Sequence, residues 1–323
     1  MDSPKTASSH LADMLPPLTR WNANGEPTAC VQIVHGMMEH HGRYARFATQ
    51  LAAAGYEVWA HDHRGHGANA SMGMGHFGDR DGWRTLVTDT AAVTQRIRTE
   101  RPATPVILFG HSMGSFIAQT LMTERAQDYA GIVLAGSNGP DIGSHCVALV
   151  VALIERRLRG AREQSRWMTA WLRTSFNRQF RPTRTVADWI SRDEREVDAA
   201  LRDTLCGAGL TTQSWIDFAK GLLALDAPQR FRYLPESMPI LVMSGTREPV
   251  GRNGRGPVRL ARALESGGLR DVTVMLYPEA RHELVNETNR DRVTQDVIAW
   301  LNARLLRQAV DEAERSNTHS TVE

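Results

Sequence analysis

The sequence contains little that would support disulfides, a thiolate metal site or export. Its three cysteines, Cys30, Cys146 and Cys206, are far apart, odd in number and without a Cys-x-x-Cys spacing. This pattern favours neither a disulfide framework nor a zinc site, so a reducing compartment is the simpler expectation. Residues 1–18 lack the apolar core of a signal peptide, and no apolar run approaches the roughly 18 residues of a membrane span. We therefore expect a cytoplasmic protein without a transmembrane segment.

An excess of charge of either sign is also missing. The 38 basic residues, all arginine except Lys5 and Lys220, are balanced by 36 acidic residues, which leaves a formal charge of +2. A nucleic-acid-binding protein would normally carry a strong basic excess, so we expect no nucleic-acid partner. The length of 323 residues is enough for one large α/β domain with an insertion, or for two small domains.

One stretch combines a buried strand, a sharp turn and a helix. Residues 105–109 form an apolar run typical of a strand buried on both faces, and Gly110-His111-Ser112-Met113-Gly114 follows directly. A serine in such a turn is held in strained backbone with its hydroxyl projecting, and small residues on both sides let the strand and the helix pass closely. The stretch predicts Ser112 as a nucleophile. The alternative is a capping serine in a glycine-rich turn.

Strands and helices alternate along most of the chain. We expect strands near residues 18–22, 30–34, 56–60, 106–109, 131–135, 240–243 and 272–277. We expect helices near residues 44–54, 82–101, 113–125, 258–265 and 290–306. This rhythm predicts an α/β fold with a mostly parallel central sheet that helices cover on both faces.

The alternation stops between residues 139 and 235. This segment contains no strand candidate and has helical patterns at 147–159, 165–174, 187–192, 194–201 and 214–225. About a hundred helical residues between two strands of one sheet are best explained as a cap over the strand ends. We predict a loose leader at 1–17, a core at 18–138 and 236–310, a helical cap at 139–235 and a frayed tail at 311–323.

Three side chains of complementary chemistry follow predicted strands, in the order Ser112, Glu248, His282. Sites of parallel α/β sheets form outside the carboxyl ends of the strands, so these side chains can meet there. A serine hydroxyl needs a base within hydrogen-bond reach, and a histidine can provide it at neutral pH. A carboxylate then fixes the imidazole tautomer and stabilises the imidazolium. The backbone amides of Met37 and Met113 are the predicted oxyanion donors.

Four ordered motifs resemble the monoacylglycerol lipase and lysophospholipase group of α/β hydrolases. They are His35-Gly36-x-x-Glu39-His40-x-Gly42-Arg43-Tyr44, Asp62-His63-Arg64-Gly65-His66-Gly67, Gly110-His111-Ser112-Met113-Gly114 and Arg281-His282-Glu283. The similarity extends from about residue 31 to 301. It implies an α/β-hydrolase fold and a serine hydrolase that cleaves carboxylic esters of glycerol or related lipids, without a metal or organic cofactor.

One residue departs from the pattern of this group, whose members usually have aspartate at the position of Glu248. Glutamate is one methylene longer and can do the same work if its loop lies slightly further back. Asp141 follows the preceding strand and is the alternative acid. A histidine without a carboxylate partner is the third possibility.

Seven histidines lie in or near the first two motif loops and suggest a metal site: His35, His40, His41, His61, His63, His66 and His76. They follow two different strands and match motifs in which such residues hydrogen-bond loop backbone. We therefore interpret them as structural and predict no metal.

The predicted cap is rich in apolar and aromatic residues and in arginine. Part of its apolar surface should face Ser112 and bind an acyl chain, while most of it packs the cap. Its arginines outnumber its acids, which is typical of a solvated helix face; the alternative is contact with anionic lipid surfaces.

Other functions fit the same fold. An acyltransferase would use the same three residues, and an aminopeptidase would need acidic groups for a free amine, whereas this cap is basic. A non-catalytic ligand-binding protein is the remaining alternative. The function that the residues favour is a serine esterase or lipase acting on monoacyl lipids through an acyl-serine intermediate.

Overall fold

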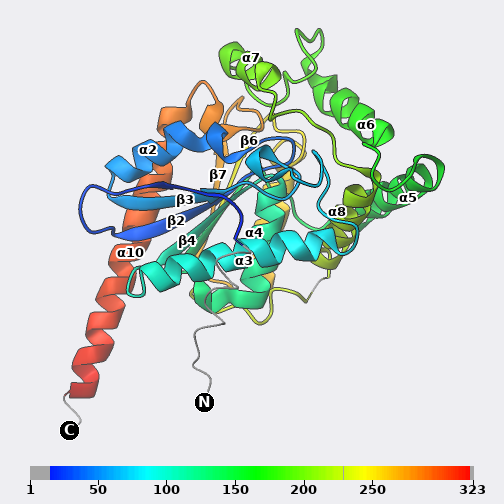
Figure 1. The fold of residues 1–323 in the computed structure, drawn as a ribbon. Coiled ribbons are helices and arrows are strands. Elements are labelled where there is room, and N and C mark those ends of the chain that lie inside the picture. Colours follow the sequence, from blue (N-terminus) through cyan, green and yellow to red (C-terminus); the bar gives the residue numbers. More distant parts are fainter. Residues whose placement is uncertain (1–14, 228, 321–323) are drawn as a thin grey trace, which may run out of the picture.

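A single sheet organises the computed structural model, which describes residues 15–227 and 229–320 (Figure 1). Its strands are Leu18–Trp21 (β1), Ala29–Val34 (β2), Tyr56–His61 (β3), Val106–His111 (β4), Gly131–Ala135 (β5), Ile240–Gly245 (β6) and Val272–Tyr277 (β7). They lie in the order β1-β3-β2-β4-β5-β6-β7. Only the edge strand β1 is antiparallel to its neighbour. The predicted α/β class and mostly parallel sheet are confirmed.

Helices cover both faces of this sheet. They are Ala45–Ala53 (α2), Gly82–Glu100 (α3), Met113–Arg125 (α4), Arg255–Ser266 (α9) and Arg290–Ser320 (α10), with short 3-10 turns at His41–Tyr44 (η1), Gly67–Asn69 (η2), Ala126–Asp128 (η3) and Leu284–Asn286 (η5). Alternate strand residues divide between two cores. In β4, Leu108 packs with α3, α4 and α9, whereas Phe109 packs with α2 and α10. Central strands buried on both faces explain their continuous apolar runs.

The segment between β5 and β6 is helical. It contains Ile142–Arg159 (α5), Arg166–Asn177 (α6), Arg178–Phe180 (η4), Glu194–Arg202 (α7) and Thr212–Leu225 (α8). α8 packs on the core, where the Phe218 ring lies 5.6 Å from that of Trp83 and 6.1 Å from that of Phe116. α5, α6 and α7 lie to one side of the sheet (Figure 1). Within the described residues, no helix is both long and apolar enough to cross a bilayer.

Two predicted elements differ from the structure. Residues 187–192 form turns rather than a helix. The carbonyls of Trp189 and Ile190 accept N–H groups from His282 (3.4 Å) and Glu283 (2.7 Å), so they are not available for helical bonds. The last helix does not end near residue 306, because α10 continues to Ser320 through a segment without glycine or proline. The predicted frayed tail at 311–323 is thus helical as far as Ser320. Of the predicted leader at 1–17, residues 1–14 lie outside the described residues.

The turn between β4 and α4 is tightly packed against neighbouring backbone. A Cβ atom on Gly110 would lie 2.5 Å from the carbonyl oxygen of Gly114. A Cβ atom on Gly114 would overlap the carbonyl oxygen of Val34 and lie 2.6 Å from that of His35. Real Cβ atoms do not approach backbone this closely. Both positions therefore require glycine, for the steric reason expected from the sequence.

This packing predicts the effect of adding one methyl group. Gly114→Ala should lower the free energy of unfolding by about 3 kcal/mol or more, because backbone on both sides must move. Gly143→Ala is the matched control, since Gly143 lies in exposed helix α5 with nothing within 4 Å of the added Cβ. Alanine is the better helix former, so the control should gain up to about 1 kcal/mol. Urea unfolding measures both, and equal stabilities of the two variants would contradict the steric explanation.

Candidate active site

Ser112 lies between β4 and α4 in strained backbone. Its φ of 52° and ψ of −119° lie in a region that non-glycine residues rarely adopt. The strain is held from both sides, because its N–H donates to Ala135 (2.9 Å) and its carbonyl accepts the N–H of Ser115 (2.9 Å). The side chain is half-buried and lines a pocket. The turn thus places Ser112 at the wall of that pocket, and its role as a nucleophile stays a prediction.

His282 is paired with Glu248. The Nδ1 of His282 lies 2.7 Å from Oε1 of Glu248, and both side chains are almost fully buried. A carboxylate only accepts hydrogen bonds, so Nδ1 carries the proton and Nε2 is left as the acceptor. Glu248 is held in turn by the backbone N–H groups of Val250 (2.8 Å) and Gly251. This is the tautomer that a general base requires.

Asp141, the alternative acid, is engaged elsewhere. Its carboxylate forms an ion pair with Arg252, and its backbone N–H donates to Asp226 Oδ1 at 2.7 Å. Of the two candidate acids, the structure therefore places Glu248 on His282 and leaves Asp141 on a neighbouring loop.

Ser112 and His282 line the same pocket. The His282 ring lies between those of Trp189 (4.9 Å between centroids) and His111 (4.6 Å), the residue before Ser112. Among the described residues, the Ser112 hydroxyl has no hydrogen-bond partner. Hydrogen bonds of catalytic groups often tighten only when substrate is bound, so this arrangement suits a nucleophile and base that align on a substrate.

Two residues that line the same pocket, Met37 and Met113, have backbone amides of interest. Met113 is the first residue of α4, so its N–H has no partner within the helix. Met37 lies in the loop after β2, and an added Cβ on the neighbouring Gly36 would lie 3.1 Å from the side chain of Ser112. Neither amide has a hydrogen-bond partner among the residues described here. Both Met37 and Met113 line the pocket beside Ser112.

The loop that carries Met37 is held by a carboxyl group that sequence reasoning did not single out. Glu39 Oε1 accepts the N–H of Gly36 and the hydroxyl of Tyr44 (2.7 Å). Burial and the nearby charge of Glu283 raise the pKa of Glu39 to about 7. Glu283 is itself paired with Arg43 across 240 residues of sequence. Glu39 and Arg43 belong to the first motif, so the sequence did mark them as motif residues. Nothing in the sequence indicates that Arg43 pairs with Glu283.

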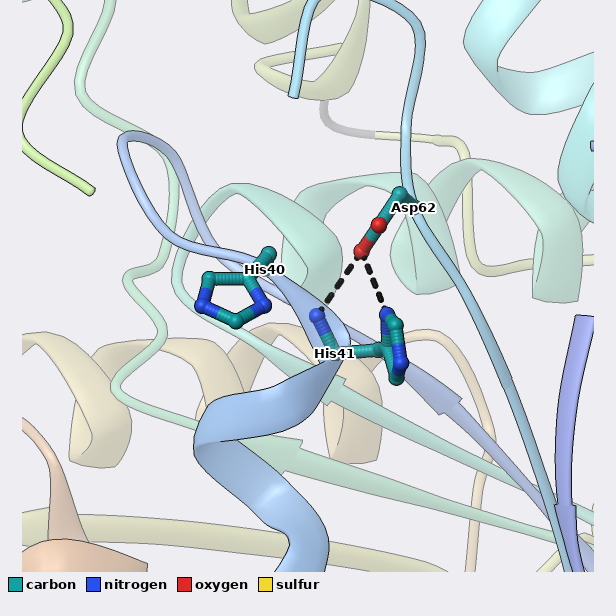
Figure 2. Close-up of side chains that lie close together, drawn as sticks. All are labelled: His40, His41 and Asp62. Carbon is teal, nitrogen blue, oxygen red and sulfur yellow. Dashed lines mark hydrogen bonds and ion pairs between the residues drawn. The ribbon is translucent and has the colours of Figure 1, made fainter. Parts of the chain in front are cut away.

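Asp62 holds the turn at His41, which follows the loop of Met37 and Glu39 (Figure 2). Its Oδ1 accepts both the backbone N–H of His41 (2.9 Å) and the ring Nδ1 of His41 (2.8 Å), and its Oδ2 accepts the N–H of Ala68 (2.8 Å). These bonds hold the pKa of Asp62 far below its usual range despite its burial. The second motif thus buttresses the loop of the first.

Several histidines of the two motif loops hydrogen-bond backbone, whereas the ring of His41 contacts the side chains of Asp62 and Thr19. His35 Nδ1 donates to the carbonyl of Gly36 (2.7 Å), its Nε2 accepts the N–H of His63 (3.0 Å), and His63 Nε2 donates to the carbonyl of His35 (3.1 Å). His66 Nδ1 donates to the carbonyl of Arg64 (3.1 Å). Burial lowers the pKa of His66 to about 4, so it is neutral at physiological pH.

The pocket above Ser112 has a volume of about 440 Å³, within the range of sites that enclose a small organic ligand. Its wall is mostly apolar and comes from the core and from α5, α6, α7 and α8. Apolar residues that line it are Met37, Met113, Phe116, Ala148, Met168, Trp171, Leu172, Phe176, Val186, Trp189, Ile190, Leu201, Trp215, Phe218 and Leu222. An apolar pocket with a few polar groups at one end suits a ligand with a long hydrocarbon part.

The sheet order, the strained serine after β4 and the His–Glu pair after later strands define an α/β-hydrolase. The chain belongs to the Hydrolase_4 family, described as serine aminopeptidase, S33, which matches residues 25–289. A monoacylglycerol lipase of Mycolicibacterium smegmatis is 28% identical over 293 residues, covering 88% of this chain and 92% of that protein. The human monoglyceride lipase is 28% identical over 292 residues, covering 88% of this chain and 86% of that protein.

Solved structures give the same result. A thermostable carboxyl esterase from Bacillus coagulans, in complex with glycerol, has a TM-score of 0.83 and 27% identity, covering 89% of this chain and 94% of that chain. A lipase in an open form has a TM-score of 0.77 and 25% identity over the same shares. The predicted class, a serine ester hydrolase of the monoglyceride lipase type, is confirmed by these relatives.

The geometry of the two acids predicts different effects of removing their charge. Glu248→Gln should lower kcat by about 10⁴-fold, because an amide can donate to Nδ1 and favour the wrong imidazole tautomer. Asp141→Asn should cost a few-fold at most, because Asp141 contacts Arg252 and not His282. Steady-state rates on a p-nitrophenyl ester, with circular dichroism as a folding control, measure both. A large loss in Asp141→Asn alone would move the acid role to Asp141.

Proposed function

We propose that this protein hydrolyses carboxylic esters of monoacyl lipids, with Ser112 as nucleophile, His282 as base and Glu248 as the supporting acid. Ser112 Oγ attacks the ester carbonyl while His282 Nε2 takes its proton. The oxyanion is held by the amides of Met37 and Met113. His282 then returns the proton to the leaving alcohol, and water releases the acyl group by the reverse sequence. This chemistry requires no cofactor.

The observation that carries this proposal is one mostly apolar pocket that Ser112, His282, Met37 and Met113 line together. Each methylene of an acyl chain buried in it contributes about 0.8 kcal/mol of binding free energy. The resemblance of the chain to monoacylglycerol lipases supports a single acyl chain on a glycerol-like alcohol. The related carboxyl esterase was solved in complex with glycerol, the alcohol part of a monoacylglycerol.

Cleavage of a peptide from its free amino end is less well supported, despite the family description. Such an enzyme needs an unpaired carboxylate to hold the amine of its substrate. Of the acids that line the pocket, Asp141 is paired with Arg252, and Glu283 with Arg43. Glu39 is engaged by Gly36 and Tyr44, and the pKa of about 7 leaves it half protonated at neutral pH. The pocket therefore favours a neutral ester.

Ser112→Ala tests the proposed function. It should reduce monoacylglycerol hydrolysis by at least about a thousandfold without loss of folding, because the nucleophile is gone. For the unaltered enzyme, kcat/KM over a series of monoacylglycerols should rise by about fourfold per methylene until the pocket is full. Fatty-acid release measures both. Turnover retained by Ser112→Ala, or a preference for aminoacyl amides over every ester, would refute the proposal.

We also propose that the cap contacts anionic lipid surfaces. Six large apolar residues of α5 are exposed, together with two tryptophans of α6: Ile142, Val147, Val150, Leu153, Ile154, Leu158, Trp167 and Trp171. Arginines beside them have no side-chain hydrogen bond or ion pair with any described residue; they are Arg156, Arg157, Arg166 and Arg173. An apolar face flanked by free cations is suited to an anionic interface, where each arginine contributes about 1 kcal/mol.

Vesicle sedimentation tests this contact. Binding to vesicles with anionic lipid should exceed binding to neutral vesicles and should weaken with added salt. Arg166→Gln with Arg173→Gln should reduce the affinity by about fivefold per arginine. Arg270→Gln is the control, because Arg270 is also exposed, is paired with Glu236 and precedes β7, at the opposite end of the strands from the pocket. Equal losses in the double variant and the control would refute a specific role of the cap.

A further inference from the structure

Three side chains that the proposed reaction does not use meet at the junction of the core and the helical segment. His40 follows β2, whereas Asp203 and Cys206 follow α7. One nitrogen, one carboxylate oxygen and one sulfur of these residues all lie within 4.8 Å of one another. His40 Nε2 and Asp203 Oδ2 are 2.8 Å apart. His40, Asp203 and Cys206 are far apart in the sequence and meet only in the folded chain. The spacing of the cysteines therefore could not indicate this site.

The backbone around these side chains is well fixed. Asp203 uses Oδ1 to accept the N–H of Leu205 (2.9 Å), which leaves Oδ2 directed at His40. The N–H of Cys206 donates to the carbonyl of Asp203 (3.0 Å), and Gly207 donates to the carbonyl of Met38 (2.8 Å). The turn that carries Asp203 and Cys206 is thus bonded to the loop that carries His40. The three donors are already gathered before any ion arrives.

Their chemistry suits zinc. Imidazole nitrogen, carboxylate oxygen and thiolate sulfur are its usual ligands, with bonds of about 2.0 to 2.3 Å. Two ligands on one tetrahedral ion at these lengths lie about 3.3 to 3.6 Å apart. The His40–Asp203 pair must therefore open by only about half an ångström. All three residues are partly exposed, so an ion can reach them from solvent.

A second set of metal-compatible donors, His40, His41 and Asp62, is less suitable (Figure 2). Both oxygens of Asp62 are occupied by His41 and Ala68. The other ring nitrogen of His41 lies 2.9 Å from the hydroxyl of Thr19. An ion there would have to break the bonds that hold both motif loops. At the first set, an ion replaces the hydrogen bond between His40 and Asp203 and the weak bond from Gly42 to His40.

We propose that His40, Asp203 and Cys206 bind a zinc ion, with water as the fourth ligand, and that this ion restrains the entrance of the pocket. His40 Nδ1 accepts the N–H of Gly42 (3.2 Å), so Nε2 carries the ring proton in the free protein. On binding, that proton moves to Nδ1 and the weak bond to Gly42 is lost. The thiol proton of Cys206 leaves to solvent, so that one proton is released per ion bound.

The site is connected to turnover through its neighbours. Cys206 and Gly207 line the pocket next to Met37, Met38 and Glu39, and the N–H of Gly207 donates to the carbonyl of Met38. An ion bound to His40 and Cys206 adds a second, stronger tie between these two neighbouring segments at the pocket. Opening of the pocket between them for substrate entry and product release then has to break metal bonds, so the zinc-bound enzyme should turn over more slowly.

Cobalt and zinc titrations of the full-length enzyme, first treated with a chelator, test the proposal. Cobalt should produce a thiolate charge-transfer absorption with one equivalent bound, a signal that does not depend on activity. Zinc should displace the cobalt and lower ester hydrolysis at least tenfold, and a chelator should restore the rate. Cys206→Ser should lose the absorption and at least tenfold in zinc affinity. Asp203→Asn should also lower the zinc affinity.

Cys146→Ser is the matched control, because Cys146 is an exposed cysteine of α5 that does not line the pocket. It should keep the absorption and the inhibition of the unaltered enzyme. Each variant is compared with its own metal-free rate. Three results would overturn the proposal. The first is an absorption that survives Cys206→Ser, and the second is zinc inhibition that survives Cys206→Ser because the ion binds His282. The third is zinc binding that leaves hydrolysis unchanged. Failure of the proposed function would instead remove hydrolysis in the metal-free enzyme.

Discussion

The close approach of α4 to the end of β2 is the constraint on which the site depends. Gly114 lies directly against the carbonyl groups of Val34 and His35, with no room for a side chain. The same contact brings the loop after β2 beside Ser112, so one packing arrangement positions both the hydroxyl and the amide of Met37. The strained φ of Ser112 persists because hydrogen bonds to Ala135 and Ser115 hold it on both sides.

Buried carboxyl groups around the pocket differ in charge because they differ in their donors. Asp62 accepts three hydrogen bonds from nitrogen, and they hold its pKa low although it is buried. Glu39 is also buried, but the negative charge of Glu283 opposes its ionisation, and its pKa rises to about 7. Glu248 accepts two backbone amides in addition to His282. The donors around a buried carboxyl group and the charges beside it thus decide in which direction its pKa moves.

Much of the fold and the chemistry could be predicted from local sequence. Central strands such as β4 are apolar throughout because both faces are buried, and the glycines around Ser112 mark its close packing. The 187–192 turns could not be predicted, because their carbonyls bond to amides almost a hundred residues away. The pairing of Arg43 with Glu283 and the meeting of His40 with Cys206 depend on tertiary contacts for the same reason. Periodicity reports which face of an element is buried, but not which distant loop contacts it.

The hydrogen bonds from His282 and Glu283 to Trp189 and Ile190 have a consequence for how this enzyme could change over evolution. They attach the loop of the proposed base, His282, to the segment inserted between β5 and β6, and the Trp189 ring packs on the imidazole itself. The insertion is therefore not an independent module. Exchanging it for that of a relative would misplace the imidazole unless the loop around His282 were transplanted with it, so substrate range and catalytic geometry are expected to diverge together.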